Sequence, residues 1–398
     1  MLQLSFVNFR KDSYLVVEGK AESDRFFIIQ QGHVRCHREN EVPGENPELL
    51  GPGDFVGVIP CMSGHSQIET VIAITDVVAI SVRREQYPEL IARNTPVAMK
   101  IIRTFANRMR MLNEKLTELT LKNVVAESPE QMFDVAEYYE KIGKPNVAIF
   151  AYYQYLKACP YSTHSAKAKE RFIVLKPKAH AVYFEPTPDL LRVYPKDTMI
   201  FSECQRGAEM FIIQDGKVKI TKVVDGNEVT LAVLKKGDMF GEMALLENKP
   251  RSASAIADEE CRLMTVNRQN FDQMVATQAQ LIARLTTMLA DRLWSMSRQL
   301  ANTQLGDPLF KLLDMLALQI EKAKIRLEPN TQFQTDLTLE DVANMCGIPQ
   351  NQQAAGLYKL QTDPHIKLIH GKILVPDCLE LVKQAAFYRK PKHASPSV

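Results

Sequence analysis

The feature that most restricts how this chain can fold is an internal repeat. Three pairs of segments match one another: FFIIQQGHVRC at Phe26 with MFIIQDGKVKI at Met210, GDFVG at Gly53 with GDMFG at Gly237, and TDVVAISVRREQYPELI at Thr75 with EECRLMTVNRQNFDQMV at Glu259. Each pair is separated by the same 184 residues, the distance from Gly53 to Gly237. One ungapped register over this length rarely arises by chance, so the chain carries two copies of one domain, at about 1–120 and 185–300.

Each copy alternates apolar and polar residues in short runs that glycines separate, as in FIIQDGKVKI. Short strands with turn residues between them predict an antiparallel barrel or sandwich. The fold class we predict is therefore α+β and multidomain: two antiparallel β-barrel or jelly-roll domains, a helical hairpin linker and a C-terminal winged helix-turn-helix.

Each copy then ends in a helical pattern. In the second copy, apolar residues recur every three or four positions at Leu281, Leu285, Leu289, Leu293, Met296 and Leu300. The first copy has its own version at Val97, Ile101, Phe105 and Met109. Such a stripe can pack on its own domain, or it can join two chains because its spacing is nearly that of a coiled coil. From the second alternative we expect a homodimer through the 276–300 helix.

The segment at 128–172 has no strand character. Aromatic and alanine residues fall at helical spacing, with breaks at 143–145 and at Pro160. This pattern predicts a helical hairpin and the start of a third helix, and its residues resemble one tetratricopeptide-type unit. We expect a structural linker, with a protein-binding surface as the alternative.

Composition excludes several classes of protein. The formal net charge is only +2, so the whole chain has no general attraction for nucleic acid or for a membrane. The seven cysteines are scattered, without CxxC spacing or a histidine cluster, which predicts reduced thiols and no metal site. The N-terminus does not resemble a signal peptide, and no apolar run is long enough to cross a bilayer. We therefore expect a cytoplasmic protein without a membrane partner.

The stretch GDMFGEMALLENKPRSAS, residues 237–254, places an acid and a base around a short apolar turn. A helix that begins at Glu242 or Met243 would direct free backbone N–H groups at an anion. Arg251 supplies a planar fork that suits a phosphate, and the carboxylate of Glu242 can accept hydrogen bonds from a sugar hydroxyl. Three small residues leave room for a ligand: Ala244, Ala253 and Ala255.

The pattern FGEMALLENKPRSASAIA resembles the phosphate-binding cassette of cyclic nucleotide-binding domains. The resemblance implies that Glu242 takes the ribose 2′-hydroxyl and that Arg251 takes the cyclic phosphate of cAMP or cGMP. The residues that it implicates in ligand binding are Gly241, Glu242, Met243, Ala244, Arg251, Ser252 and Ala253, and from the long helix Trp294 and Ser297. The alternatives are that Glu242 and Arg251 only pair with each other, and that Trp294 only packs in the core.

The first copy serves as an internal control for this reading. At the same offset, Glu242 corresponds to Val58 and Arg251 to Gln67. A carboxylate, Glu69, falls close to the expected phosphate position. We therefore predict that the first copy is structural and binds no cyclic nucleotide.

The C-terminal part predicts a helix, a turn, a second helix and a two-stranded hairpin. Thr338 with Asp341 can cap the first helix, the second helix starts at Gln350, and the hairpin covers 366–375. This order is that of a winged helix-turn-helix, and it resembles the DNA-binding end of bacterial regulators that respond to cyclic nucleotides. The candidate DNA-binding residues are Gln350, Asn351, Gln352, Lys359 and Lys372.

The second helix departs from those regulators. It has no arginine, although phosphate contacts dominate affinity for DNA. Gln353 and Gly356 stand where apolar residues usually join the two helices. Cations in or beyond the hairpin are the remaining source of phosphate contacts: Lys367, Lys372, Lys383, Arg389, Lys390 and Lys392.

The predicted domains are 1–125, a degenerate copy; 126–184, the helical linker; 185–302, the ligand-binding copy with its long helix; 303–386, the winged-helix-like domain; and 387–398, a basic tail. We expect a sensor whose second copy binds cAMP and controls the C-terminal domain, with transcriptional regulation as its candidate role. The alternative is a signalling adaptor that contacts proteins and not DNA. We expect no enzyme, because the sequence has no phosphate-binding Walker loop, hydrolase triad or metal-ligand spacing.

Overall fold

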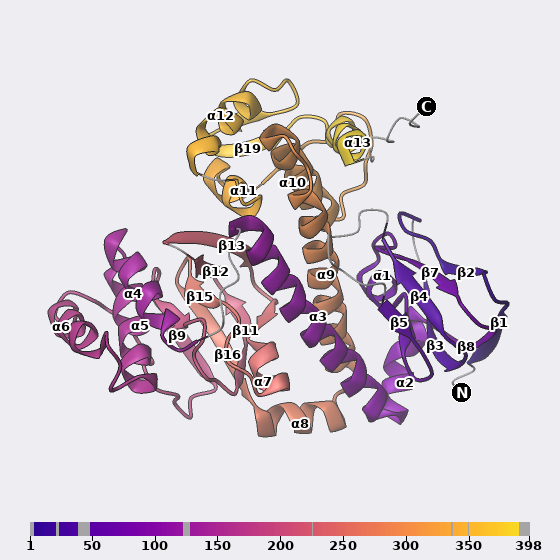
Figure 1. Cartoon of the computed structure of the whole chain (residues 1–398), viewed down its shortest axis with the longest axis horizontal. Helices are drawn as coiled ribbons and strands as arrows, with labels where there is room; N and C mark the ends of the chain where they lie inside the picture. The colour runs from indigo at the N-terminus through magenta and orange to yellow at the C-terminus, as the bar shows by residue number, and fades with distance from the viewer. Residues whose placement is uncertain are drawn as a thin grey trace.

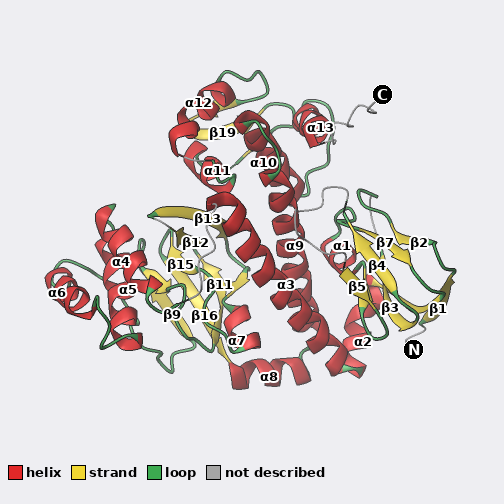
Figure 2. Ribbon diagram, viewed as in Figure 1, coloured by secondary structure: helices red, strands yellow, loops and turns green. Residues whose placement is uncertain are grey.

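A computed structural model of the chain describes residues 4–20, 24–38, 48–121, 128–224, 226–335, 337–348 and 350–389. Two β-sheet domains lie on opposite sides of a central pair of long helices, and the C-terminal unit lies at one end of that pair (Figure 1). Figure 2 shows that the strands are confined to the two flanking domains and to a small sheet in the C-terminal unit.

The first copy is a pair of four-stranded antiparallel sheets, ordered β1-β8-β3-β6 and β2-β7-β4-β5. Its elements are β1 (Ser5–Phe9), β2 (Tyr14–Val16), β3 (Arg25–Gln31), β4 (Val34–His37), β5 (Glu48–Leu50), β6 (Phe55–Val56), α1 (Val58–Ser63), β7 (Thr70–Ala73), β8 (Val77–Arg83), a 3-10 turn (Arg84–Gln86), α2 (Tyr87–Arg93) and α3 (Thr95–Leu121). The space between the sheets is filled by an apolar core that includes Phe27, Ile29 and Val71.

The second copy repeats this design with sheets ordered β14-β11-β16-β9 and β10-β15-β12-β13. Its elements are β9 (Leu191–Tyr194), β10 (Met199–Phe201), β11 (Glu209–Asp215), β12 (Val218–Val224), β13 (Asn227–Leu234), β14 (Met239–Phe240), α7 (Glu242–Glu247), β15 (Ser254–Ala257), β16 (Cys261–Asn267), α8 (Arg268–Thr277) and α9 (Ala279–Thr303). Phe201, Phe211 and Phe240 form an aromatic cluster between its sheets.

The offset found in the sequence also relates the two copies in space. Strands β3 and β11, helices α1 and α7, strands β7 and β15, and strands β8 and β16 each begin and end 184 residues apart. The glycine before each short helix has a left-handed backbone, with φ of 73° at Gly57 and 78° at Gly241. The prediction of two antiparallel β domains from one repeat is therefore confirmed.

The two long helices, α3 and α9, pack against each other at the centre of the chain (Figure 1). The apolar stripe predicted on α9 is buried there, with Leu285, Leu289 and Leu293 at most 1% exposed. The expectation of a homodimer through this helix therefore needs correction. The partner of the stripe is α3 of the same chain, so the face is already covered.

Between the two copies lie α4 (Gln131–Lys141), α5 (Pro145–Ala158) and α6 (Ser165–Leu175). The chain turns between α4 and α5 at Gly143, whose φ is 75°. These helices share a core with the outer face of the second copy, because Tyr139 and Tyr152 cluster with Met199 and Ile256.

The C-terminal unit contains α10 (Pro308–Lys322), β17 (Phe333–Gln334), α11 (Leu339–Met345), α12 (Gln350–Gln361), β18 (Lys367–Ile369), β19 (Lys372–Val375) and α13 (Cys378–Arg389). Thr338 and Asp341 cap α11 reciprocally. The β18–β19 turn uses left-handed residues at His370 and Gly371, as a two-residue hairpin requires.

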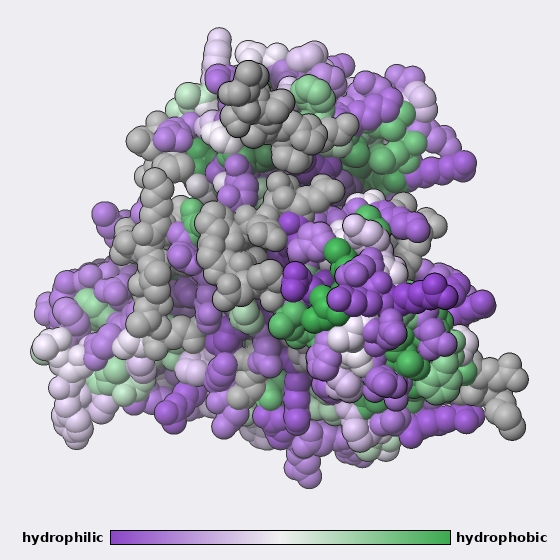
Figure 3. Space-filling model, turned by 45° about the vertical axis from the view of Figure 1, so that its right-hand side comes forward, coloured by the Kyte–Doolittle hydropathy of each residue, from purple (hydrophilic) through white to green (hydrophobic). Residues whose placement is uncertain are grey.

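Within the described part of the chain, no helix is both long and apolar enough to cross a membrane. Hydrophilic side chains cover most of the face in Figure 3, and hydrophobic side chains form small patches on it. None of the seven cysteines, all of which lie in the described residues, forms a disulfide bond.

Candidate functional site

The cassette of the second copy begins where β14 ends. Gly241 follows Phe240 with a left-handed backbone and starts α7. A Cβ atom at Gly241 would lie 2.7 Å from Nη1 of Arg251 and 3.3 Å from the carbonyl oxygen of Glu209. Glycine is therefore needed here both for the backbone angle and for the close approach of the arginine.

Arg251 is buried, with 5% of its surface exposed. Its Nη1 donates to the carbonyl of Gly241 at 2.7 Å, and its Nη2 donates to the carbonyl of Glu209 at 2.8 Å. The guanidinium lies 4.1 Å from the centre of the Phe201 ring. On another side, a Cβ at Gly207 would come within 2.7 Å of Nη2, so two glycines make room for this cation.

No carboxylate in the described residues forms an ion pair with Arg251. The nearest acid, Glu209, is paired with Arg192 at 2.8 Å. The Nε atom of Arg251 is buried without a hydrogen-bond partner among the described residues, and burial lowers the pKa of the guanidinium to about 10. A buried cation without a counterion is costly, and the site therefore favours an anion.

Glu242 is the acid of the cassette and is 1% exposed. Its Oε1 accepts from Arg292 of α9 at 3.1 Å, and Arg292 also donates to the carbonyl of Met239. The second oxygen, Oε2, is buried without a partner in the described structure. The alternative in which Glu242 and Arg251 pair with each other is therefore not what the structure has.

The remaining cassette residues lie near Glu242 and Arg251 in the chain. Ser252 is half-buried, and its Oγ lies 3.8 Å from Sδ of Met243. The small residues expected to leave room are instead part of the buried interior: Ala244, Ala253 and Ala255. The structure thus brings together the seven cassette residues that the sequence implicates, on α7 and on the loop before β15.

The two long-helix candidates, Trp294 and Ser297, lie elsewhere or face inward. The Trp294 ring stacks on His65 of the first copy at 3.8 Å, and its indole N–H donates to the carbonyl of Ser66. A ring held there is not free to stack on a base in the second copy, so the packing alternative is the one that fits. Ser297 is 9% exposed, and its Oγ has no partner among the described residues.

The first copy keeps the frame of the cassette and replaces its chemistry. Gln67, which takes the place of Arg251, is buried beside Gly57. Glu69 pairs with Arg108 of α3 at 2.7 Å. Burial alone would raise the pKa of Glu69, but Arg108 outweighs it and holds the pKa below the ordinary value. Arg108 therefore largely neutralises the negative charge that Glu69 brings to the expected phosphate position. The first copy still offers no cation at the position of Arg251.

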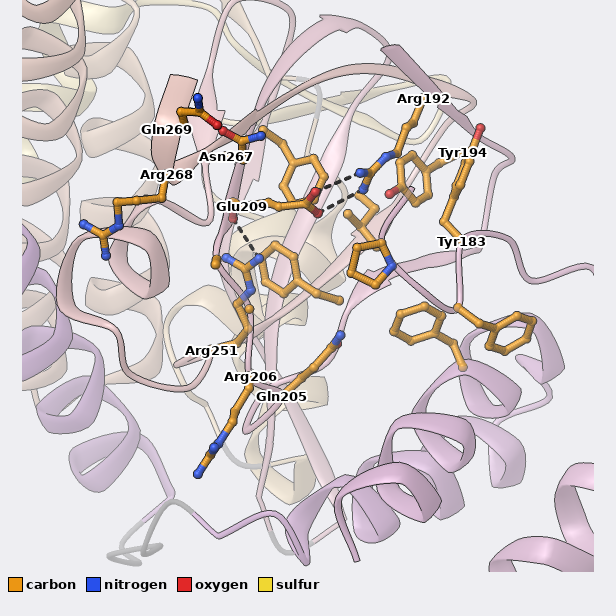
Figure 4. A pocket seen from close by; sticks show the side chains of 18 residues that line it. Tyr183, Arg192, Tyr194, Gln205, Arg206, Glu209, Arg251, Asn267, Arg268 and Gln269 are labelled. Atoms are coloured by element: carbon orange, nitrogen blue, oxygen red, sulfur yellow. Dashed lines mark hydrogen bonds and ion pairs between the residues drawn. The ribbon is translucent and has the colours of Figure 1, made fainter. Parts of the chain in front are cut away.

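A cavity of about 380 Å³ adjoins Arg251 (Figure 4). Its walls are the pair Arg192 and Glu209, the loop at 205–208, and Tyr183 with Phe184 at the edge of the helical unit. Its volume is within the range of small-molecule sites. Sequence reasoning missed Arg192, Gly207 and Glu209. The signal was present in the repeat, since Glu209 corresponds to Arg25 and Arg192 corresponds to Val7 in the first copy.

The candidates for DNA contact are only partly available. Lys359, the one cation of α12, lies 3.8 Å from Asp307, Lys383 pairs with Glu380, and Arg389 pairs with Asp314. Gln352, Lys367 and Lys372 are exposed. The side chains of Gln350 and Asn351 lie outside the described structure, as do Lys390, Lys392 and the rest of the predicted tail beyond residue 389.

No group of three or more histidine, cysteine, aspartate or glutamate residues in the described chain is placed to hold a metal ion.

The two β domains share one design, and the second holds a buried arginine and a buried carboxylate in a glycine-framed cassette. The model of the cyclic nucleotide-binding domain family matches residues 6–94 and 191–278. The chain therefore contains two copies of this domain.

Parts of this chain are similar to known proteins. A CRP-like cAMP-activated global transcriptional regulator of Mycobacterium tuberculosis is 26% identical over 193 residues, which cover 48% of this chain and 86% of that protein. A cAMP-dependent protein kinase regulatory subunit of Mycosarcoma maydis is 34% identical over 99 residues, covering 24% and 19%. Among solved structures, a CooA mutant from Carboxydothermus hydrogenoformans has a TM-score of 0.43 and 17% identity, covering 49% of this chain and 87% of that one.

Proposed function

We propose that the second copy binds a cyclic nucleotide, with cAMP the preferred candidate, and that the first copy does not. The observation that carries the proposal is the buried Arg251 cation without an ion pair, beside a buried Glu242 with one unpartnered oxygen. A cyclic phosphate supplies the missing anion, and a ribose hydroxyl supplies the missing donor. Several relatives carry cAMP in their names, which supports the ligand class.

The test is calorimetric titration of cAMP and cGMP into the full chain and two matched variants. Arg251→Ala removes the cation of the second copy, and Gln67→Ala truncates the corresponding residue of the first. We expect wild type and Gln67→Ala to bind alike and Arg251→Ala to bind at least about a hundredfold more weakly. Loss of cAMP binding in Gln67→Ala alone would place the ligand in the first copy and contradict the proposal. No binding by wild type would overturn it as well.

We further propose that α9 carries the response to the C-terminal unit. Arg292, the partner of Glu242, is on α9. Further along the same helix, Gln299 donates to the carbonyl of Met345 in α11 at 2.7 Å. A second link joins Lys219 of β12 to Asp341 of α11 at 3.1 Å. A ribose hydroxyl that binds Glu242 would compete with Arg292 and alter this contact. Such coupling requires two positions of α9, and the ligand must bind the protein more tightly in one of them than in the other.

For the output we propose a winged helix-turn-helix made of α11, α12 and the β18–β19 hairpin. Gln353 donates to Asn344 and to the carbonyl of Ile348, so hydrogen bonds join the two helices where apolar contacts are usual. A Cβ at Gly356 would approach Pro308 to 3.1 Å, so a small residue lets α12 lie close to α10. The exposed hairpin lysines, Lys367 and Lys372, are the DNA contacts that this proposal requires.

A signalling adaptor is the second candidate, and the surface of α12 favours it. Its exposed residues include Ala354, Ala355 and Tyr358, with Tyr358 69% exposed, while Lys359 faces Asp307. A gel shift with random duplex DNA at low salt, with and without cAMP, separates the two. If the protein shifts DNA and the double variant Lys367→Gln, Lys372→Gln shifts it more weakly, the result supports the regulator. If no DNA is shifted with or without cAMP, the result supports the adaptor.

A further inference from the structure

The two long helices are exchanged between the copies. Helix α9, which follows the second copy, packs on α1, the short cassette helix of the first. Helix α3, which follows the first copy, packs on α7, the cassette helix of the second. Figure 2 shows both helices between the two sheet domains. The short cassette helix of each copy thus packs on the long helix that belongs to the other copy.

One pair of hydrogen bonds shows how closely this exchange is repeated. Nη2 of Arg110 on α3 donates to the carbonyl of Pro250 at 3.1 Å. Nε1 of Trp294 on α9 donates to the carbonyl of Ser66 at 3.1 Å. The donors stand 184 residues apart, and so do the acceptors. The two contacts are therefore equivalent under the exchange of the copies.

Contacts that repeat in this reciprocal way are the mark of a twofold interface between identical subunits. Here both halves of the interface are in one chain. We propose that the first copy is the built-in partner of the second, and that Arg110 is a positioning residue that holds the cassette loop of the second copy for its ligand. This inference rests on the proposed binding of a cyclic nucleotide by the second copy.

The position of Arg110 gives it this role. It is 4% exposed, and the carbonyl that it contacts belongs to the residue directly before Arg251. The opposite side of the loop is held by backbone bonds, from Arg251 N–H to the carbonyl of Gln205 and from Cys204 N–H to the carbonyl of Arg251. Arg110 therefore fixes the loop from the side of the first copy.

The equivalent place in the first copy is closed differently. The Trp294 ring covers His65, and Nζ of Lys324 donates to the carbonyl of Ser63 at 2.8 Å. An aromatic ring stands where the second cassette has a guanidinium. This difference agrees with a first copy that serves as a partner and carries no ligand.

The test compares Arg110→Met with Arg103→Met in the full chain. Both remove an arginine from α3, but Arg103 is exposed and serves as the control for charge. Calorimetry with cAMP should show about a tenfold loss of affinity in Arg110→Met, the effect of losing one hydrogen bond from a charged donor, and no change in Arg103→Met. Arg110→Lys, which keeps the cation, should recover part of the loss, which a purely steric role would not predict.

A second measurement does not depend on the nucleotide. Amide hydrogen exchange of the peptide 242–256 in the free protein should be faster in Arg110→Met than in wild type or Arg103→Met. Equal exchange would overturn the positioning role, even if the second copy binds no nucleotide. The positioning role would also be overturned if Arg110→Met bound cAMP with wild-type affinity while Arg251→Ala lost its affinity. That result would leave the proposed function intact. Thermal denaturation of each variant identifies any that fails to fold, and Arg110→Lys then decides.

Discussion

The substitution Arg251→Met separates a residue held ready for a ligand from one that supports the fold. Methionine keeps much of the side-chain length and removes the charge. Burial lowers the pKa of Arg251 to about 10, and a shift of this size corresponds to about 3 kcal/mol against the charged form in the folded state. The variant is relieved of that cost.

The variant also loses the two hydrogen bonds to the carbonyls of Gly241 and Glu209. Hydrogen bonds from a charged donor contribute about 1.5–3 kcal/mol each. The two effects oppose each other, so we expect the free energy of unfolding without ligand to fall by roughly 0–3 kcal/mol.

Binding has no such compensation. Loss of a buried charged partner costs about 3 kcal/mol, which is roughly a hundredfold in affinity. At a nucleotide concentration of about 1,000 times the wild-type Kd, ligand raises the unfolding free energy of wild type by ~4 kcal/mol. At the same concentration the variant gains only about 1.4 kcal/mol.

Urea denaturation with and without cAMP measures both quantities. Gln67→Met, at the corresponding place in the first copy, is the matched control and should retain the full gain from ligand. A variant Arg251→Met that keeps the wild-type gain would refute the reasoning. So would an unliganded variant destabilised by more than about 5 kcal/mol, since Arg251 would then be a structural residue.

Two further substitutions test the frame around the site. Gly241→Ala should lower both stability and cAMP affinity, because its Cβ would lie 2.7 Å from Arg251. The control Gly143→Ala, at a φ of 75° with no atom within 4 Å, should cost only about 1 kcal/mol of backbone strain. Thermal denaturation and calorimetry compare the two variants, and equal effects would contradict the contact with Arg251. Arg108→Met leaves Glu69 buried and unpaired, so we expect a loss of about 3 kcal/mol at pH 7. In wild type Arg108, against the effect of burial, holds the pKa of Glu69 below its ordinary 4.5, so the pair's stability is present above that pH and is lost as the pH falls through the lowered value. The deficit of the variant in urea denaturation should therefore shrink toward pH 3, and a constant deficit would exclude the ion pair as its cause.

The sequence was most informative where local chemistry decides the structure. The offset between the copies predicted which strands correspond, because turn glycines such as Gly57 and Gly241 keep their left-handed backbones in both. The cassette residues come together as expected, since they lie within one short helix and the loop that follows it. Thr338 and Asp341 form the predicted cap, which needs only residues three apart.

Contacts between distant segments were beyond the reach of the sequence. A nearly heptad-like stripe on α9 shows that a helix needs an apolar partner, but it does not show whether that partner is α3 or another chain. The sequence left two places open for Trp294, against a base or in the core, because its place against His65 depends on how the copies meet. The pairing of Glu242 with Arg292 was hidden for the same reason, although Arg108 stands 184 residues before Arg292 and pairs with Glu69 in the first copy.

The central claim is that only the second of two equivalent domains binds a cyclic nucleotide. The stoichiometry of cAMP binding to the full chain tests it most directly, by calorimetry at protein concentrations well above the Kd. The account predicts one nucleotide per chain in wild type, and an affinity at least about a hundredfold lower in Arg251→Ala. Two nucleotides per chain, or none, would contradict it.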